Sequence, residues 1–230
     1  MTATPSLHRH QLAWLTRSGW SAVRARPWDA QARDCLAHWD SHRLPLVVTR
    51  QPADACAGGC IALGLPAPAR WNRRRLALQV PLTDVQGFGE FPLLADVLDL
   101  LPPAVLDAAR TLLGRLGECH AAARVFGSYG WQAISGLDHV RTGSDLDLSI
   151  AVDGAAHADA VVRALCAFKA EQPRLDGELL FADGAAVAWR EWNEWRAGRA
   201  RAVMVKRLDG VALQHDGAWC ESAGMKELAA

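Results

Sequence analysis

The stretch VFGSYGWQAISGLDHVRTGSDLDLSI, residues 125–150, determines the expected fold and contains the main candidate functional residues. It holds a Gly-Ser pair at Gly127 and Ser128 and then, after a gap, Asp145 and Asp147 in an otherwise apolar run. Residues two apart in a strand project from the same face of the sheet, so these two like charges repel each other. A fold keeps such a pair readily only when a positive group lies between them.

The composition excludes several classes of protein. The chain has 230 residues, of which 50% are hydrophobic, and its formal net charge is zero. That length suits one large or two small domains, and the neutral charge argues against a general binder of nucleic acid or membrane surfaces. The six cysteines form no CxxC pair, and no signal peptide or apolar run of about 18 residues is visible. We therefore expect a cytoplasmic protein with reduced thiols.

The first part of the chain predicts a small N-terminal α+β domain over residues 1–85. A helix is expected over 29–43, from its helical spacing of apolar residues. Strands are expected over 44–51, 59–68 and 74–82, which are apolar runs. The segment 83–92, TDVQGFGEFP, contains glycines and a proline and is interpreted as a linker.

A second domain is expected over residues 91–230. Its central strand is SDLDLSIAVD, 144–153, in which Leu146, Leu148 and Ile150 share one face and the two aspartates share the other with Ser149. The further expected elements are helices over 91–102, 102–123 and 155–172, a short strand ending near Phe126, the start of a helix or a tight turn over 129–137, a strand, turn and second strand passing into a helix over 174–195, and a strand over 202–205.

The Gly-Ser pair and the two aspartates suggest complementary chemistry. Carboxylates on one sheet face suit Mg²⁺, which prefers hard oxygen ligands and occurs singly or in pairs at phosphoryl-transfer sites. A turn between a strand and a helix presents backbone N–H groups to phosphate oxygens, and glycine lets the phosphate approach closely. The Ser128 hydroxyl adds a further donor.

The order of these motifs resembles the polymerase-β type of nucleotidyltransferase, whose signature is GS followed by [ST]-D-x-D on the next strand. The resemblance implies an α+β fold with a mixed sheet, and it assigns Gly127, Ser128 and Ser144 to substrate binding. It makes Asp145 and Asp147 the catalytic ligands of Mg²⁺. A third catalytic carboxylate is implied on a later strand, where LDGEL offers two candidates. Asp176 is favoured because an apolar residue precedes it, and Glu178 stays open.

Flanking stretches narrow the resemblance to one family. The whole chain resembles the malonate decarboxylase holo-acyl-carrier-protein synthases, which are phosphoribosyl-dephospho-CoA transferases. The stretches that carry this resemblance are HRHQLAWL, LPLVVTRQ, IALGLPAP, RRRLALQV and DGELLFADGAAVAWREW. The implied reaction moves a 5″-phosphoribosyl-3′-dephospho-CoA group from triphosphoribosyl-dephospho-CoA to a serine of the acyl-carrier subunit of malonate decarboxylase, and pyrophosphate leaves. The third carboxylate would share a second metal or act as general base.

Several interpretations stay open at this point. The basic run ARWNRRR, with Arg70, Arg73, Arg74 and Arg75, either binds substrate phosphates or the carrier protein, or is a solvated loop. His8 and His10 contact substrate or lie on the surface, and Trp131 stacks on adenine or packs in the core.

Two other functions also remain open. One is a different nucleotidyltransferase, which modifies a protein or a small molecule. The other is a binding module without catalysis, against which the intact Asp145 and Asp147 argue.

Overall fold

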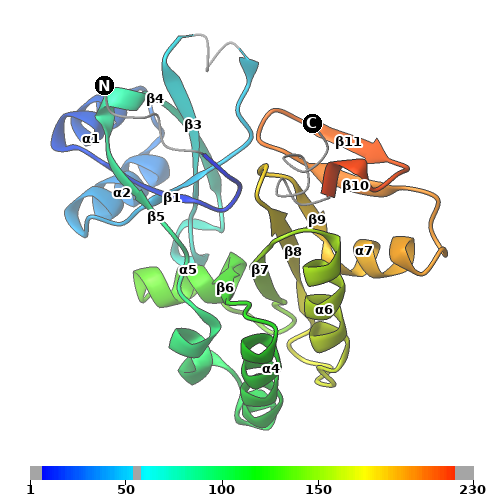
Figure 1. Cartoon of the computed structure of the whole chain (residues 1–230). Coiled ribbons are helices and arrows are strands. Elements are labelled where there is room, and N and C mark those ends of the chain that lie inside the picture. The colour runs from blue at the N-terminus through cyan, green and yellow to red at the C-terminus, as the bar shows by residue number, and fades with distance from the viewer. Residues whose placement is uncertain (1–6, 54–57, 221–230) are drawn as a thin grey trace.

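The computed structural model describes residues 7–53 and 58–220 and contains two β-sheets, each with its own helices (Figure 1). The first sheet and its helices occupy the blue-to-cyan part of the chain, and the second sheet and its helices occupy the green-to-red part. The expected α+β class is therefore confirmed. The two parts are called the N-terminal and C-terminal domains below.

The N-terminal sheet has the order β4-β3-β2-β1-β5 and is antiparallel throughout. In β3 and β4, buried and exposed or half-buried residues alternate, because one face packs on helices and the other does not. The elements of this domain are β1 Leu12–Leu15, α1 Arg17–Arg24, α2 Ala30–Ser41, β2 Leu46–Val48, β3 Cys60–Pro66, β4 Arg75–Pro81 and β5 Val85–Gly89.

The C-terminal sheet has the order β11-β10-β9-β8-β7-β6 and is mixed, because β7 and β8 run parallel while the other neighbours are antiparallel. The crossover from β7 to β8 passes through α6, as parallel pairing requires. The elements of this domain are α4 Leu106–Glu118, β6 Ala123–Phe126, α5 Gly127–Ser135, β7 Leu146–Val152, α6 Ala155–Cys166, β8 Leu175–Phe181, β9 Ala186–Ala188, α7 Trp189–Arg196, β10 Val203–Lys206 and β11 Val211–Gln214.

Helix α5 joins the two hydrophobic cores. Its Tyr129 belongs to the core of the C-terminal domain, whereas its Trp131 packs into the core of the N-terminal domain beside Phe91 and Trp39. Gly130, between them, lets the helix lie directly on β6, since a Cβ at this position would overlap the Val125 carbonyl oxygen. The start of α5 is thereby fixed from both sides.

The structure differs from the sequence-based expectation at the junction of the domains. The segment 83–92 is not a linker, because β5 within it pairs with β1 along its length and forms one edge of the N-terminal sheet. The expected helix over 91–102 is a 3₁₀ helix over Leu94–Leu100. Helix α1 and strand β11 had no counterpart among the expected elements.

Candidate active site

The Gly-Ser pair lies at the point where β6 turns into α5. Gly127 is the first residue of the helix and has φ +62°, a conformation that favours glycine. A Cβ there would overlap the carboxylate of Asp147, so the absence of a side chain allows that carboxylate to lie against the turn. The first turn of α5 leaves its backbone N–H groups without helical partners.

The register of three strands brings the acidic residues together. Asp147 lies opposite Phe126 on β6 and opposite Asp176 on β8. Asp145 directly precedes β7, and the burial pattern places Leu146 and Leu148 on the buried face, as the sequence predicts. Asp145, Asp147 and Asp176 therefore gather at one end of the β7–β8 pair, beside Gly127.

Arg174 supplies the positive charge in this structure. Its guanidinium donates to both carboxylate oxygens of Asp145, at 3.2 and 2.7 Å, and its Nη2 also donates to Asp176 at 3.1 Å. Arg174 had not been singled out from the sequence. A signal was nevertheless present, since Arg174 and Asp176 are two residues apart and therefore share a face of the strand.

Asp147 is the acid whose charge is least compensated. Burial and the nearby charges of Asp176 and Asp145 raise the pKa of Asp147 to about 7. Arg174 acts in the opposite direction but does not outweigh them. A half-buried carboxyl with a raised pKa in a cleft is a candidate for a functional group, and a bound cation would favour its charged form.

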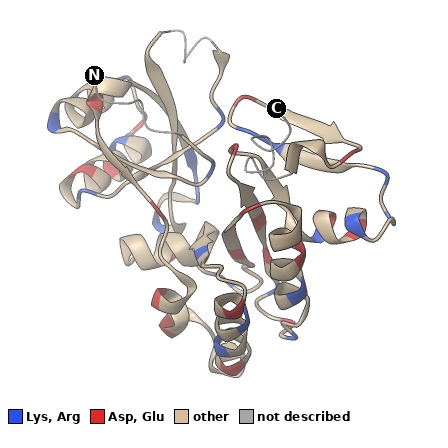
Figure 2. Cartoon of the chain, in the orientation of Figure 1, with Lys and Arg blue, Asp and Glu red and all other residues tan. Residues whose placement is uncertain are grey.

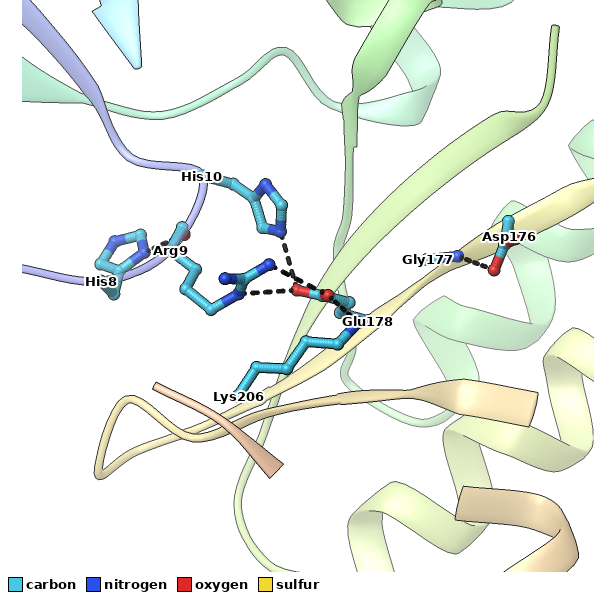
Figure 3. Close-up of polar contacts among 7 residues, drawn as sticks. All are labelled: His8, Arg9, His10, Asp176, Gly177, Glu178 and Lys206. Carbon is cyan, nitrogen blue, oxygen red and sulfur yellow. Dashed lines mark hydrogen bonds and ion pairs between the residues drawn. The ribbon is translucent and has the colours of Figure 1, made fainter. Parts of the chain in front are cut away.

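Glu178, the other candidate for the third carboxylate, has different surroundings (Figure 3). Arg9 donates to both of its oxygens, at 3.1 and 3.2 Å, His10 Nε2 donates at 2.8 Å and Lys206 Nζ donates at 2.9 Å. Burial alone would raise its pKa, but the hydrogen bonds and charges of His10 and Arg9 hold the pKa below its usual range. Glu178 therefore serves as an ionised anchor between the domains, and Asp176 is the residue that faces the other aspartates.

Asp147 lines a cleft between the two domains, with a volume of about 730 Å³. We refer to it as the cleft. From the N-terminal domain it is lined by residues that include Val47, Thr49, Gly64, Arg73, Arg75 and Ala77. From the C-terminal domain it is lined by residues that include Phe126, Gly127, Ser128, Trp131, His139, Arg141 and Asp147. Its residues come from segments far apart in the sequence.

The remaining predicted substrate-binding residues are placed in two groups. Arg73 and Arg75 line the cleft, and Arg73 also donates to the His139 carbonyl oxygen at 2.9 Å across the domain boundary. Arg74 instead pairs with Asp29, the N-cap residue of α2. Ser144 is buried, and its hydroxyl accepts from the Arg141 backbone N–H, so it tightens the loop before Asp145 and does not line the cleft.

Of His8, His10 and Trp131, the structure places the last two in the lining of the cleft. His10 lines the cleft, where its ring stacks on Phe126 with centroids 3.9 Å apart. His8 lies outside the cleft lining and donates to Glu90. Trp131 is buried against aromatic neighbours, as the packing alternative predicts, and it also lines the cleft.

The donor set of the acids suits a magnesium ion chemically, since Asp145, Asp147 and Asp176 all offer carboxylate oxygens. Within residues 7–53 and 58–220, no group of three or more His, Cys, Asp or Glu side chains is arranged as a metal site. Arg174 holds two of the three carboxylates here. The charged positions on β7 and β8 are visible in Figure 2.

Two family models together match most of the chain. The model of the phosphoribosyl-dephospho-CoA transferase MdcG N-terminal domain matches residues 8–91, and that of the C-terminal domain matches residues 93–217. The chain belongs to this family. A phosphoribosyl-dephospho-CoA transferase of Bradyrhizobium diazoefficiens is 34% identical over 89% of this chain and 88% of its own length. One from Xanthomonas campestris pv. campestris is 36% identical over 89% of this chain and 92% of its own length.

Membership of the phosphoribosyl-dephospho-CoA transferase family makes the protein a transferase and confirms the resemblance seen in its motifs. No solved structure was found to match the chain. In the described part of the chain, every helix is too short or too polar to cross a bilayer.

Proposed function

We propose that this protein transfers the 5″-phosphoribosyl-3′-dephospho-CoA group from its triphosphate precursor to a serine of the malonate decarboxylase acyl-carrier protein, with release of pyrophosphate. The observation that carries the proposal is the placement of Asp147 between Gly127 and Asp176 at the edge of the cleft. Membership of a family of phosphoribosyl-dephospho-CoA transferases supports the transferred group. The carrier-protein acceptor rests on the resemblance of the whole chain to the malonate decarboxylase synthases.

The start of α5 is assigned to the triphosphate. Backbone N–H groups at the first turn and the Ser128 hydroxyl donate to phosphate oxygens, and the positive end of the helix dipole favours the anion there. Gly127 keeps the backbone open to a close approach. These groups hold the leaving pyrophosphate while the acceptor serine attacks the phosphorus next to the ribose.

Asp145 and Asp147 are assigned to bind Mg²⁺, and Asp176 is assigned as the third carboxylate. Magnesium held by these residues would screen the charge of the triphosphate and would stabilise the charge that develops on the leaving group. Asp176 lies in register with Asp147 and is half-exposed, so it is available to accept the proton of the attacking hydroxyl. Glu178, held by Arg9, His10 and Lys206, is not assigned a part in the chemistry.

Arg174 is assigned as the stabilising partner of the acids before substrate and metal bind. It contacts Asp145 and Asp176 and is itself half-exposed, so its side chain is free to move toward a phosphate. This exchange of partners would keep the acidic cluster neutralised in both states. The positive group that the paired aspartates require would thus be Arg174 in the free protein.

Intact-mass spectrometry of the acyl-carrier subunit tests the proposal. The subunit is incubated with the protein, Mg²⁺ and triphosphoribosyl-dephospho-CoA, and in parallel with ATP in place of that precursor. We expect the carrier to gain the mass of one phosphoribosyl-dephospho-CoA group on serine in the first reaction and no mass in the second. A gain of a nucleotide from ATP instead would assign the protein to a different nucleotidyltransferase activity.

A further inference from the structure

The N-terminal wall of the cleft is formed by β3 and β4, and largely by the sheet face that lies opposite the hydrophobic core. In β3 and β4 the buried residues, such as Leu63 and Leu76, alternate with residues of the opposite face. That opposite face contributes Gly64 and Ala77 to the cleft, and the small, exposed side chain of Ala77 leaves room there for a ligand. This wall therefore leaves space for a part of a ligand that lies outside the acidic end of the site.

The cleft is also positively charged, along this wall and on the C-terminal side. Arg75 of the wall and Arg141 of the C-terminal domain line the cleft, and neither guanidinium has a hydrogen-bond or ion-pair partner within the described residues. Arg73 uses its guanidinium on a backbone carbonyl, which leaves its charge uncompensated. Among the described lining residues, Asp147 is the one acid. One guanidinium group can donate two parallel hydrogen bonds to the oxygens of a phosphate, so this arrangement favours an anionic phosphate ester.

His139 provides an independent sign of a ligand. Its side chain is 5% exposed, it lines the cleft, and its Nε2 has no hydrogen-bond partner among the described residues. Leaving a buried polar atom unpaired is costly. Burial and the charge of Arg73 lower the pKa of His139 to about 4, so the ring is neutral at pH 7 and suited to an uncharged polar group.

We infer that the N-terminal wall of the cleft, together with His139 of the C-terminal domain, binds the dephospho-CoA arm of the precursor. Arg73 and Arg75 contact its diphosphate, and His139 contacts one of its uncharged polar groups. The arm contains both kinds of group, a diphosphate and the neutral adenine and amides. The cleft runs from this wall to Gly127 and Asp147, so one substrate would span both. Its volume of about 730 Å³ lies in the ordinary range for ligand sites. The inference rests on the proposed function, because that function supplies the identity of the arm.

Titration calorimetry with 3′-dephospho-CoA, which lacks the triphosphate, tests this assignment on the full chain. Arg75→Ala and Ala77→Trp each should weaken its binding about tenfold or more, by loss of a charge-assisted contact and by obstruction of the wall. Ala77 is exposed, so its replacement leaves the core intact. The matched control is Arg70→Ala, because Arg70 lies over the ring of Trp71 outside the cleft, and its binding should equal that of the wild type.

His139→Phe keeps an aromatic ring against Trp131 and removes the unpaired nitrogen. It should weaken binding of 3′-dephospho-CoA about three- to tenfold. Unchanged binding in Arg75→Ala and Ala77→Trp, with a raised KM for the carrier protein alone, would overturn the inference and assign the wall to the carrier. The proposed function is judged separately: if the wild type binds 3′-dephospho-CoA at this wall but modifies no carrier, that function fails while the binding site stands.

Discussion

At the scale of single residues, the site shows a conflict between charge and burial. Asp147 is surrounded by other acids and is partly removed from water, and its pKa is raised to about 7 by that burial and by Asp176 and Asp145. An unfolded chain ionises this group near its ordinary value. Its charge therefore costs stability wherever the pH lies above that ordinary value.

Asp147→Asn should consequently stabilise the metal-free protein at pH 8. The substitution removes a charge that the fold disfavours and keeps the shape of the side chain. We expect the melting temperature in the presence of EDTA to rise, by about 2–4 °C for each kcal/mol gained in a chain of this size. A lower melting temperature at pH 8 would show that the carboxylate is well stabilised in the free protein, in contrast to its surroundings here.

His139 predicts a second dependence on pH. Its folded pKa of about 4 lies below the unfolded value of 6.5, so the unfolded state binds more protons between these values and stability falls as the pH falls through them. Each pH unit is worth about 1.4 kcal/mol, so the loss is roughly 3 kcal/mol over this range. Urea unfolding of the wild type and His139→Phe at several pH values measures it. The variant should lose less stability than the wild type between pH 6.5 and pH 4, and equal losses would contradict the account.

At the scale of elements, the position of α5 depends on what Gly127 lacks. A methyl group there would overlap the Asp147 carboxylate, and φ is +62°. Gly136, at the other end of the same helix, has φ +68° but open space around the position of a Cβ. The two glycines thus share a backbone conformation and differ in their contact with the site.

Gly127→Ala should therefore lower transfer strongly, by about 10²-fold or more, because it displaces the carboxylate or the turn. Gly136→Ala should cost about 1 kcal/mol of stability from its backbone conformation and leave transfer near the wild-type rate. Steady-state kinetics and urea unfolding of both variants measure this difference. Equal effects on transfer would mean that the turn does not hold Asp147 in place.

The elements also show what the sequence could reveal. Strand β7 and the turn after β6 were predicted, because alternating leucines and aspartates and a Gly-Ser pair are local signals. Strand β5 was missed because Val85–Gly89 contains two glycines and forms a strand only through its pairing with β1. Two partners of Glu178, Arg9 and His10, lie more than 160 positions away from it, and no local pattern encodes these contacts.

At the scale of the whole molecule, Glu178 joins the two domains beside the site. The segment before β1 contributes Arg9 and His10 to it, and Lys206 approaches from β10 (Figure 3). Other links cross the same boundary, including the Gln51 backbone N–H, which donates to the Leu208 carbonyl oxygen at 2.7 Å. The cleft exists because these contacts hold two separately packed cores against each other.

Glu178→Gln should destabilise the protein by about 3 kcal/mol, since it leaves the half-buried Arg9 and Lys206 without their counter-charge. The matched control is Glu194→Gln, which breaks a solvent-exposed pair with Arg199 and should leave stability nearly unchanged. Urea unfolding gives both values, and hydrogen exchange should be faster at residues 8–12 in the first variant. An effect of Glu178→Gln no larger than that of the control would show that the domains are held by other contacts.

The central claim is that the acids beside Gly127 perform the transfer, and the most direct measurement is the rate at which the carrier serine is modified by wild type and by Asp147→Asn. Intact-mass spectrometry follows the reaction with triphosphoribosyl-dephospho-CoA and Mg²⁺, and circular dichroism checks that the variant is folded. We predict a modified carrier with the wild type and a rate lower by at least about 10²–10³-fold with the variant. Transfer by folded Asp147→Asn at the wild-type rate would contradict the account.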